Sequence, residues 1–201
     1  MREGSPAKRA AIVQAALETF VREGYTRASV DAIAAAAGVS KRTIYDYYGD
    51  KHQLFVATLH ETMAGHAAEI QDLLVRTLGD VTDLEGALNR FGVAFATGIA
   101  RSTDRAAVMR LMIAEAPHFP ALREPPAGDT VQGVLAARLA ELGDQGLLEV
   151  PDPAEAAEFL GLLVTGRLNY RSWYGAVPLA DAEIADLVAG GVRVFLRAYA
   201  R

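Results

Sequence analysis

A short basic, hydroxylated and aromatic segment near the start of the chain carries the most informative chemistry. Within residues 40–48 lie two cations, two hydroxyl groups and three tyrosines. Lysine and arginine side chains neutralise phosphates, and arginine can also hydrogen-bond guanine through two donors. Threonine and tyrosine hydroxyls donate to phosphate oxygens. This combination favours contact with DNA, and the candidate side chains are Lys41, Arg42, Thr43, Tyr45 and Tyr47.

Two short helices joined by a tight turn would hold these side chains. Ser29 is a good N-cap for a helix over 30–37, and Ser40 for a second helix over 41–48. Gly38 can adopt the positive φ that the turn needs. The predicted element is therefore a helix-turn-helix. The apolar seam between its helices is expected to consist of Ile33, Val39 and Ile44.

The charge distribution supports a polyanionic partner at this end of the chain. Residues 1–52 carry a formal charge of +2, whereas the remainder carries −7, for a net charge of −5. Each polar residue taken singly could instead be an ordinary solvated side chain. Asp46 also weakens the interpretation, because a carboxylate repels phosphate unless it faces cytosine or points away from the duplex.

Helical periodicity continues along the rest of the chain, and no alternation of polar and apolar residues predicts a sheet. A first helix should end near Gly24, and Asp50 can cap a long helix that follows it. Residues 123–129 are expected to form a flexible loop. The further predicted helices cover 51–78, 84–101, 104–116, a part of 130–142, 153–174 and 180–199.

Several classes of protein are disfavoured. The chain has no cysteine, which removes disulfides and thiolate metal sites, and it has no dinucleotide-binding, P-loop or hydrolase motif. His60, Glu61, His66 and Glu69 could combine around a metal, but the six-residue histidine spacing places the two rings on different helix faces. No cofactor, metal or catalytic residue is therefore predicted. The longest apolar run, 159–164, cannot span a bilayer, and we expect a cytoplasmic protein without a membrane partner.

A resemblance to a known family covers the basic segment. Residues 8–55 resemble the DNA-binding domain of the TetR (tetracycline repressor) family of bacterial transcription regulators, most closely in SVDAIAAAAGVSKRTIYDYYGDKHQLF at 29–55. The segments RLMIAEAPHFPAL and FLGLLVTGRLNYRSWYG resemble an AcrR/AefR-like C-terminal domain. The resemblance implies an all-α fold. It would place a three-helix helix-turn-helix DNA-binding domain in 1–52 and a helical ligand-binding and dimerisation domain in 53–201.

The resemblance also assigns roles to residues. It makes 41–48 the recognition helix, with Tyr48 packing internally, and the role of Asp46 stays open. The implied DNA contacts are Ser29, Ser40, Lys41, Arg42, Thr43, Tyr45, Tyr47 and Lys51.

One recognition helix reads only a few base pairs, so we expect a two-fold homodimer. The predicted dimer residues are Phe159, Leu162, Leu163, Gly166, Ile184, Leu187, Val188, Val192 and Phe195. By the same resemblance an effector pocket would be lined by Phe91, Phe95, Met109, Met112, Ile113, His118, Phe119, Arg167, Asn169, Tyr170 and Trp173. Plain core packing within one subunit remains the alternative for both sets.

The expected function is a dimeric, ligand-responsive repressor that binds a palindromic double-stranded operator. A small apolar or amphipathic effector would release it by moving the long helix that begins near Lys51. The runner-up is a small all-α ligand-binding or scaffold protein with no DNA role, and a metal-dependent enzyme is third. The sequence does not determine the operator, the effector, the regulated genes, or repression against activation.

Overall fold

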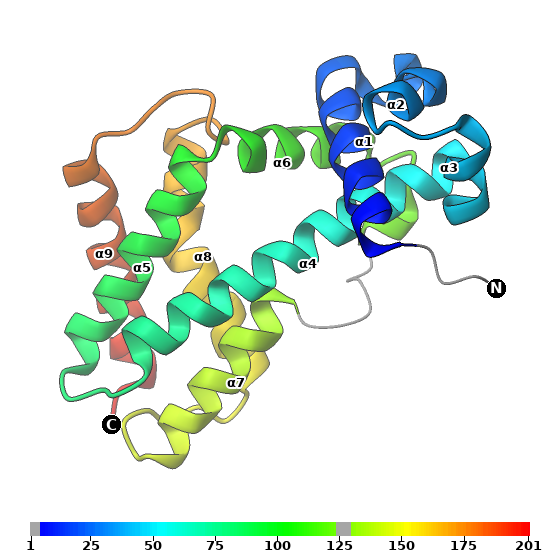
Figure 1. The fold of residues 1–201 in the computed structure, drawn as a ribbon. Helices are drawn as coiled ribbons and strands as arrows, with labels where there is room; N and C mark the ends of the chain where they lie inside the picture. The colour runs from blue at the N-terminus through cyan, green and yellow to red at the C-terminus, as the bar shows by residue number, and fades with distance from the viewer. Residues whose placement is uncertain (1–4, 124–129) are drawn as a thin grey trace. The chain divides into compact units, whose positions relative to one another are not determined.

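The computed structural model describes residues 5–123 and 130–201 (Figure 1). Among these residues the only extended pairing is an isolated bridge between Leu148 and Ala200, which confirms the predicted all-α fold. The elements are α1 (Pro6–Arg27), α2 (Val30–Ala36), α3 (Lys41–Tyr48), α4 (Lys51–Leu78), α5 (Leu84–Arg101), α6 (Thr103–Glu115), the 3-10 helix η1 (Pro120–Arg123), α7 (Val131–Asp144), α8 (Pro153–Arg171) and α9 (Asp181–Tyr199).

The chain divides into two compact units. The N-terminal unit comprises Met1–Met63 and Ala107–Pro126, and the C-terminal unit comprises Ala64–Ala106 and Ala127–Arg201. Helices α4 and α6 each supply residues to both units. Packing alone defines these units, so the expected functional division at residue 52 stays a prediction. Most of the expected flexible loop, 124–129, lies outside the described residues.

The core of the N-terminal unit joins α1, α2, α3 and the start of α4 to the segment from α6 to η1. Phe20 and Phe55 are fully buried, with ring centroids 4.9 Å apart in an edge-on arrangement. Phe119 reaches the same cluster, where its ring lies 4.6 Å from Tyr25 and 4.7 Å from Phe55. Edge-on aromatic contacts of this kind add about 0.5–1.5 kcal/mol to the free energy of area burial. The helices of the predicted helix-turn-helix therefore share a core with a distant part of the chain.

Glycines shape the two turns around α3. Gly38 has a φ of 66° and Gly49 a φ of 81°, a left-handed backbone that side chains with a Cβ rarely adopt. The amide of Val39 donates to the Ala34 carbonyl at 3.0 Å and closes the turn. After Gly49, Asp50 caps α4, because its carboxylate accepts from the Gln53 amide at 2.8 Å. Helix α3 thus begins and ends where the sequence predicts.

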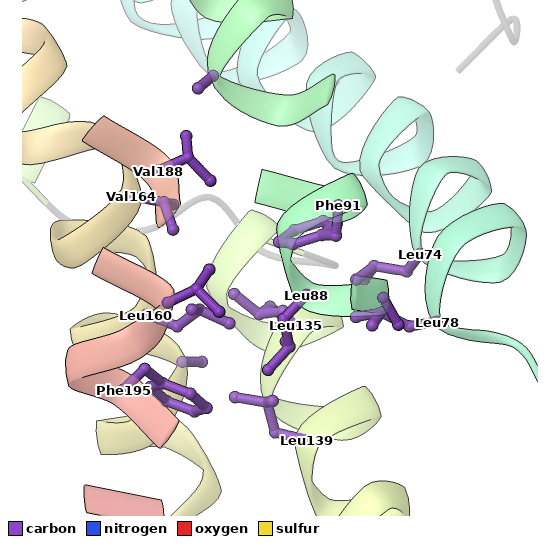
Figure 2. Close-up of a cluster of buried hydrophobic side chains, with 14 of the residues drawn as sticks. Leu74, Leu78, Leu88, Phe91, Leu135, Leu139, Leu160, Val164, Val188 and Phe195 are labelled. Atoms are coloured by element: carbon purple, nitrogen blue, oxygen red, sulfur yellow. The ribbon is translucent and has the colours of Figure 1, made fainter. Parts of the chain in front are cut away.

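The C-terminal unit packs α5, α7, α8 and α9 with the second half of α4 around one hydrophobic core (Figure 2). Close approach of α8 and α9 depends on Gly191, because a Cβ there would collide with the Leu163 carbonyl oxygen. Gly92 has the same role on α5, where a Cβ would lie 2.6 Å from a methyl group of Val188. These small residues therefore bring helices of the same chain together.

Part of the predicted dimer surface belongs to this core. Five of the expected interface side chains are no more than 5% exposed, so they have no surface to offer a second chain. Figure 2 shows Val188 and Phe195 within the cluster. Their burial favours the alternative of core packing within one subunit, because the apolar stripe of α9 faces its own unit. The five are Ile184, Leu187, Val188, Val192 and Phe195.

Helix α8 ends three residues earlier than expected. After Arg171 the backbone turns left-handed at Trp173 (φ 49°), Tyr174 (φ 53°) and Gly175 (φ 78°). The Ser172 hydroxyl accepts from the Gly175 amide at 3.0 Å and steadies the turn. Two aromatic residues in this conformation are uncommon and each carries a strain on the order of 1 kcal/mol. Periodicity could not show this end, because the apolar spacing runs on past it.

Candidate nucleic-acid interface

Helix α3 buries one side and leaves the other to solvent. Ile44 is fully buried and Tyr48 is 6% exposed, so these two side chains fix the helix on the core of the N-terminal unit. The internal position expected for Tyr48 is therefore confirmed. Lys41, Arg42 and Tyr45 are exposed on the other sides of the helix. Because every fourth residue faces inward, the polar residues between them form one continuous surface.

The predicted hydroxyl contacts also cap the helices. The Ser29 hydroxyl accepts from the Asp31 amide at 3.2 Å, and the Ser40 hydroxyl accepts from the Thr43 amide at 3.0 Å. Ser40 Oγ also lies 2.8 Å from Thr43 Oγ1. A hydroxyl that accepts one hydrogen bond keeps its own proton for a second partner. Capping and donation to a phosphate oxygen are therefore compatible.

Lys41 forms an ion pair that the sequence did not predict. Its Nζ lies 2.9 Å from Asp31 Oδ2, across the turn between α2 and α3, and 6.0 Å from the centre of the Tyr45 ring. The hydrogen bond to Asp31, together with the charge of that carboxylate, raises the pKa of Lys41 above its ordinary value. Both side chains are well exposed, so the pair itself adds little to stability.

Lys51, at the first position of α4, has neutral partners. Its ammonium group donates to the Thr26 carbonyl at 3.2 Å and lies 4.6 Å from the centre of the Tyr25 ring. An ammonium over an aromatic face is a cation–π contact. Arg42 contrasts with both lysines, because within residues 5–123 and 130–201 it has no ion pair or hydrogen bond. It is the cation most available to an incoming phosphate or base.

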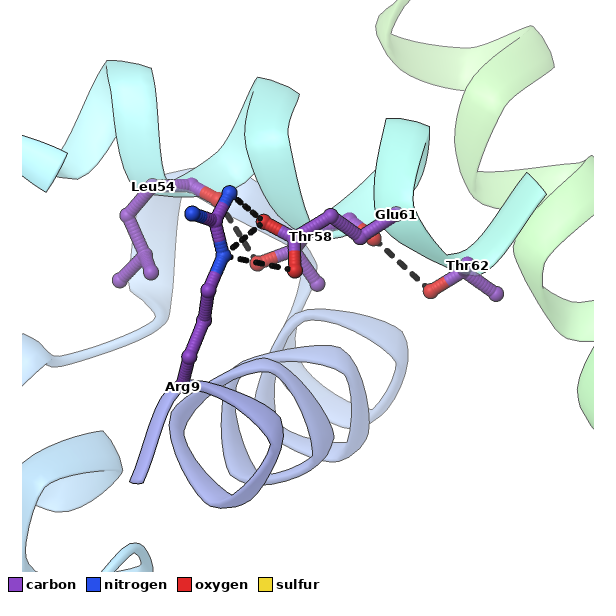
Figure 3. Close-up of polar contacts among 5 residues, drawn as sticks. All are labelled: Arg9, Leu54, Thr58, Glu61 and Thr62. Carbon is purple, nitrogen blue, oxygen red and sulfur yellow. Dashed lines mark hydrogen bonds and ion pairs between the residues drawn. The ribbon is translucent and has the colours of Figure 1, made fainter. Parts of the chain in front are cut away.

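A polar bridge in the N-terminal unit holds α1 against α4 (Figure 3). The Arg9 guanidinium donates to both carboxylate oxygens of Glu61, with contacts of 2.6 to 3.1 Å. The Arg9 guanidinium also lies 5.8 Å from the centre of the Tyr48 ring. Burial, the largest cause, raises the pKa of Tyr48 to about 12, and the charge of Glu61 adds to it while Arg9 opposes it. Sequence reasoning missed this bridge, since its residues are 52 positions apart and carry no local signal.

The predicted effector-pocket residues do not gather in one unit. Those from the segment 107–126 belong to the N-terminal unit, where Phe119 and Met112 pack on its core while Met109 and Ile113 stay exposed. By packing they therefore belong to a different core from Phe91, and their grouping with Phe91 in one effector pocket stays a prediction. The group comprises Met109, Met112, Ile113, His118 and Phe119.

The remaining pocket candidates lie in the C-terminal unit. Phe91 is 1% exposed and its ring stacks on that of Phe95 at 5.7 Å, whereas Asn169 is half-buried. Tyr170 is 79% exposed and Trp173 is 73% exposed, and such exposure does not fit a pocket-lining role in this structure. Arg167 is also exposed, beside Gly190 of α9.

Helix α8 carries an exposed apolar stripe. Phe159 is 44% exposed and Leu162 is 57% exposed, and nothing lies within 4 Å of where Gly166 would carry a Cβ. Tyr170 continues this stripe at helical spacing, and the exposed Trp173 follows in the turn after the end of α8. Leu163, in contrast, is partly buried against the core. Of the expected dimer residues, the structure therefore leaves Phe159, Leu162 and Gly166 on the surface.

The described residues also bear on metal binding and on membrane crossing. No group of three or more histidine, aspartate or glutamate side chains there could hold a metal ion. No helix among them combines the length and the apolar character that crossing a bilayer requires.

Comparison with known proteins agrees with this geometry. Residues 12–58 match the model of the bacterial regulatory proteins of the tetR family, and residues 86–201 match the C-terminal domain of AefR-like transcriptional repressors. The HTH-type transcriptional repressor SCO4008 of Streptomyces coelicolor is 38% identical over 84 residues, which are 42% of this chain and 40% of that relative. The match to this curated relative thus spans less than half of its length.

Solved structures extend the similarity to the whole fold. The flavonoid-responsive regulator FrrA is 30% identical, with a TM-score of 0.69 over 98% of each chain. A TetR-family regulator from Mesorhizobium loti superposes with a TM-score of 0.87 over 98% of this chain and 100% of its own, and its 24% identity shows the fold alone. Since one family model alone covers more than half of the chain, this protein belongs to the TetR family of transcriptional regulators, DNA-binding proteins rather than enzymes, and carries an AefR-like C-terminal domain.

Proposed function

We propose that the protein is a homodimeric repressor, acting in the cytoplasm, that binds a palindromic operator through α3. The observation that carries this proposal is the arrangement of α3, with two apolar anchors inside and Arg42, Lys41 and Tyr45 outside. A helix held this way can enter the major groove, where arginine discriminates guanine. Ser29, Ser40, Thr43, Tyr47 and Lys51 remain proposed contacts to the phosphates that flank this groove.

Binding of duplex DNA tests the role of α3. Arg42→Ala should weaken binding roughly 10- to 100-fold, because one bidentate base contact contributes about 1–3 kcal/mol. A duplex selected from a random pool by the wild-type protein provides the probe, and fluorescence anisotropy provides the affinity.

Arg76→Ala is the matched control, since it removes one exposed arginine from the C-terminal part of α4 and leaves the net charge equal to that of the first variant. If both variants bind like the wild type, α3 is not the recognition helix. If the wild type selects no duplex at all, the alternative of an all-α scaffold or ligand carrier gains support.

The dimer is proposed to form through the exposed stripe of α8 together with the outer side of α9, where Val194 is 51% exposed. Isolated apolar side chains on a surface are ordinary, but Phe159, Leu162 and Tyr170 recur at three- and four-residue steps along α8, with Gly166 between the last two. Two recognition helices on a two-fold axis would then address two half-sites about one helical turn apart.

The effector is proposed to be a small aromatic or amphipathic molecule that binds in the C-terminal unit. Phe91, Phe95 and Asn169 stay candidates for its site, since they lie in this unit and are at least half-buried. The similarity to a flavonoid-responsive regulator supports an aromatic compound. Helices α4 and α6 both run between the units, so either could carry the change to α3. A flavonoid panel that leaves the DNA affinity unchanged at saturation would contradict an aromatic effector.

A further inference from the structure

The lysines of the proposed DNA surface are occupied in the free protein, but by partners of different charge. Lys41 is paired with the carboxylate of Asp31 at 2.9 Å, whereas Lys51 meets only the Thr26 carbonyl and the Tyr25 ring. A neutral partner leaves the positive charge of the lysine uncompensated. A carboxylate cancels it, so the pair contributes no net charge to the surface.

We propose that Asp31 limits the affinity of this protein for DNA by neutralising Lys41. This inference rests on the proposed operator-binding role of α3. Asp31 lies in the first turn of α2, two residues after the cap residue Ser29, which is itself a proposed phosphate contact. Its side chain is 70% exposed and that of Lys41 is 46% exposed, so both are accessible to an approaching duplex. A bound phosphate must take Lys41 from Asp31 and then remain close to a negative charge.

On DNA binding, a phosphate would replace Asp31 as the partner of Lys41, so Asp31 would lower the affinity without abolishing binding. An exposed ion pair contributes only about 0–1 kcal/mol, so DNA can displace it. While the pair persists, Lys41 releases no counterion from the duplex, and the salt dependence of binding is correspondingly shallow. Asp31 is thus a positioning residue that acts through Lys41 and makes no base contact of its own.

Substitution of Asp31 by asparagine keeps the size of the side chain and removes its charge. Asp31→Asn should tighten binding about 3- to 10-fold near physiological salt. It should also steepen the slope of log K against log salt by about 0.9, the amount expected for one more neutralised phosphate. A purely structural role for Asp31 would not change this slope.

The experiment measures anisotropy of a duplex selected from a random pool by the wild-type protein, over a series of salt concentrations. Asp72→Asn is the matched control, because Asp72 is exposed on the C-terminal part of α4 and its substitution changes the net charge equally. Asp31→Glu, which keeps the carboxylate, should behave like the wild type. In a Lys41→Ala background, Asp31→Asn should no longer steepen the slope.

Two outcomes would overturn the proposal. An unchanged slope for Asp31→Asn would mean that Lys41 is already free to bind phosphate. Weaker binding, confined to sequences with cytosine at one position, would mean that Asp31 accepts a hydrogen bond from a base. The Arg42→Ala variant separates failure of the parent proposal, because unchanged binding by that variant removes α3 from the DNA interface altogether.

Discussion

Single residues of α3 divide between solvent and the core according to their exposure. Tyr45 is 40% exposed, Tyr47 is half-buried and Tyr48 is buried, so three tyrosines of one short helix have three environments. The guanidinium of Arg9, which bridges α1 to Glu61 of α4 (Figure 3), lies 5.8 Å from the centre of the Tyr48 ring. Asp46 is exposed and, within the described residues, forms no ion pair. Its effect on base preference remains open.

The environment of Tyr48 predicts a loss of stability in alkali. Burial raises its pKa from 10.0 to about 12, so the unfolded chain loses the proton before the folded one. The contribution to the free energy of unfolding is complete below pH 10 and is lost as the pH rises toward 12, by about 1–2 kcal/mol. Urea denaturation of wild type and Tyr48→Phe between pH 9 and 12 measures it.

The free energy of unfolding of Tyr48→Phe should decline less steeply than that of the wild type over this pH range, because phenylalanine keeps the packing and has no proton to lose. Parallel curves for the two proteins would show that other groups cause the alkaline loss.

At the scale of elements, the Ser40 cap determines where α3 begins and therefore which of its residues face solvent. The Ser40 hydroxyl satisfies the Thr43 amide, which has no carbonyl partner within the helix. The same hydroxyl is a proposed phosphate contact, so capping and DNA contact would coincide at one atom. The segment from α6 to η1 then supports α1 and α4 from the core side through Phe119.

Two substitutions of Ser40 separate these roles. Ser40→Ala removes the cap and should lower the free energy of unfolding by about 1 kcal/mol, as measured by chemical denaturation. Ser40→Asp keeps a capping oxygen and should hold stability near the wild type, but its charge should weaken DNA binding at least 10-fold. Equal DNA affinity for Ser40→Asp and wild type would place Ser40 away from the phosphates.

At the scale of the whole molecule, the proposed dimer would use a surface that one chain leaves exposed. The α8 stripe remains exposed while the apolar side of α9 is filled by its own unit. The strained turn at Trp173 and Tyr174 continues this stripe beyond the end of α8. Backbone strain often marks a functional surface, and here it accompanies the most exposed aromatic residues described.

A charge placed in the stripe tests the dimer. Leu162→Glu should convert the dimer to a monomer, since a buried unpaired carboxylate costs several kcal/mol at an interface. Sedimentation equilibrium measures the mass, and Val75→Glu, at an apolar α4 residue that is 64% exposed, is the control. A dimeric Leu162→Glu protein would locate the interface elsewhere. A wild-type monomer would contradict the dimer itself.

The sequence alone determined the helix-turn-helix and most helix limits. Ser29, Gly38, Ser40 and Gly49 act on neighbours within a few residues, so their effects on caps and turns are readable from spacing. The family resemblance added the all-α fold and the class of protein, a transcription regulator. The same local rules failed at Trp173, where apolar spacing continued although the helix did not.

Only the tertiary structure decided which of two similar apolar stripes is covered. Val188 on α9 and Leu162 on α8 have equivalent spacing and chemistry, yet the first is fully buried and the second is 57% exposed. The tertiary structure also placed Phe119 in the N-terminal core and brought Asp31 to Lys41 across a turn. Burial and pairing depend on which distant segments meet, and periodicity records only that a face is apolar, not what lies against it.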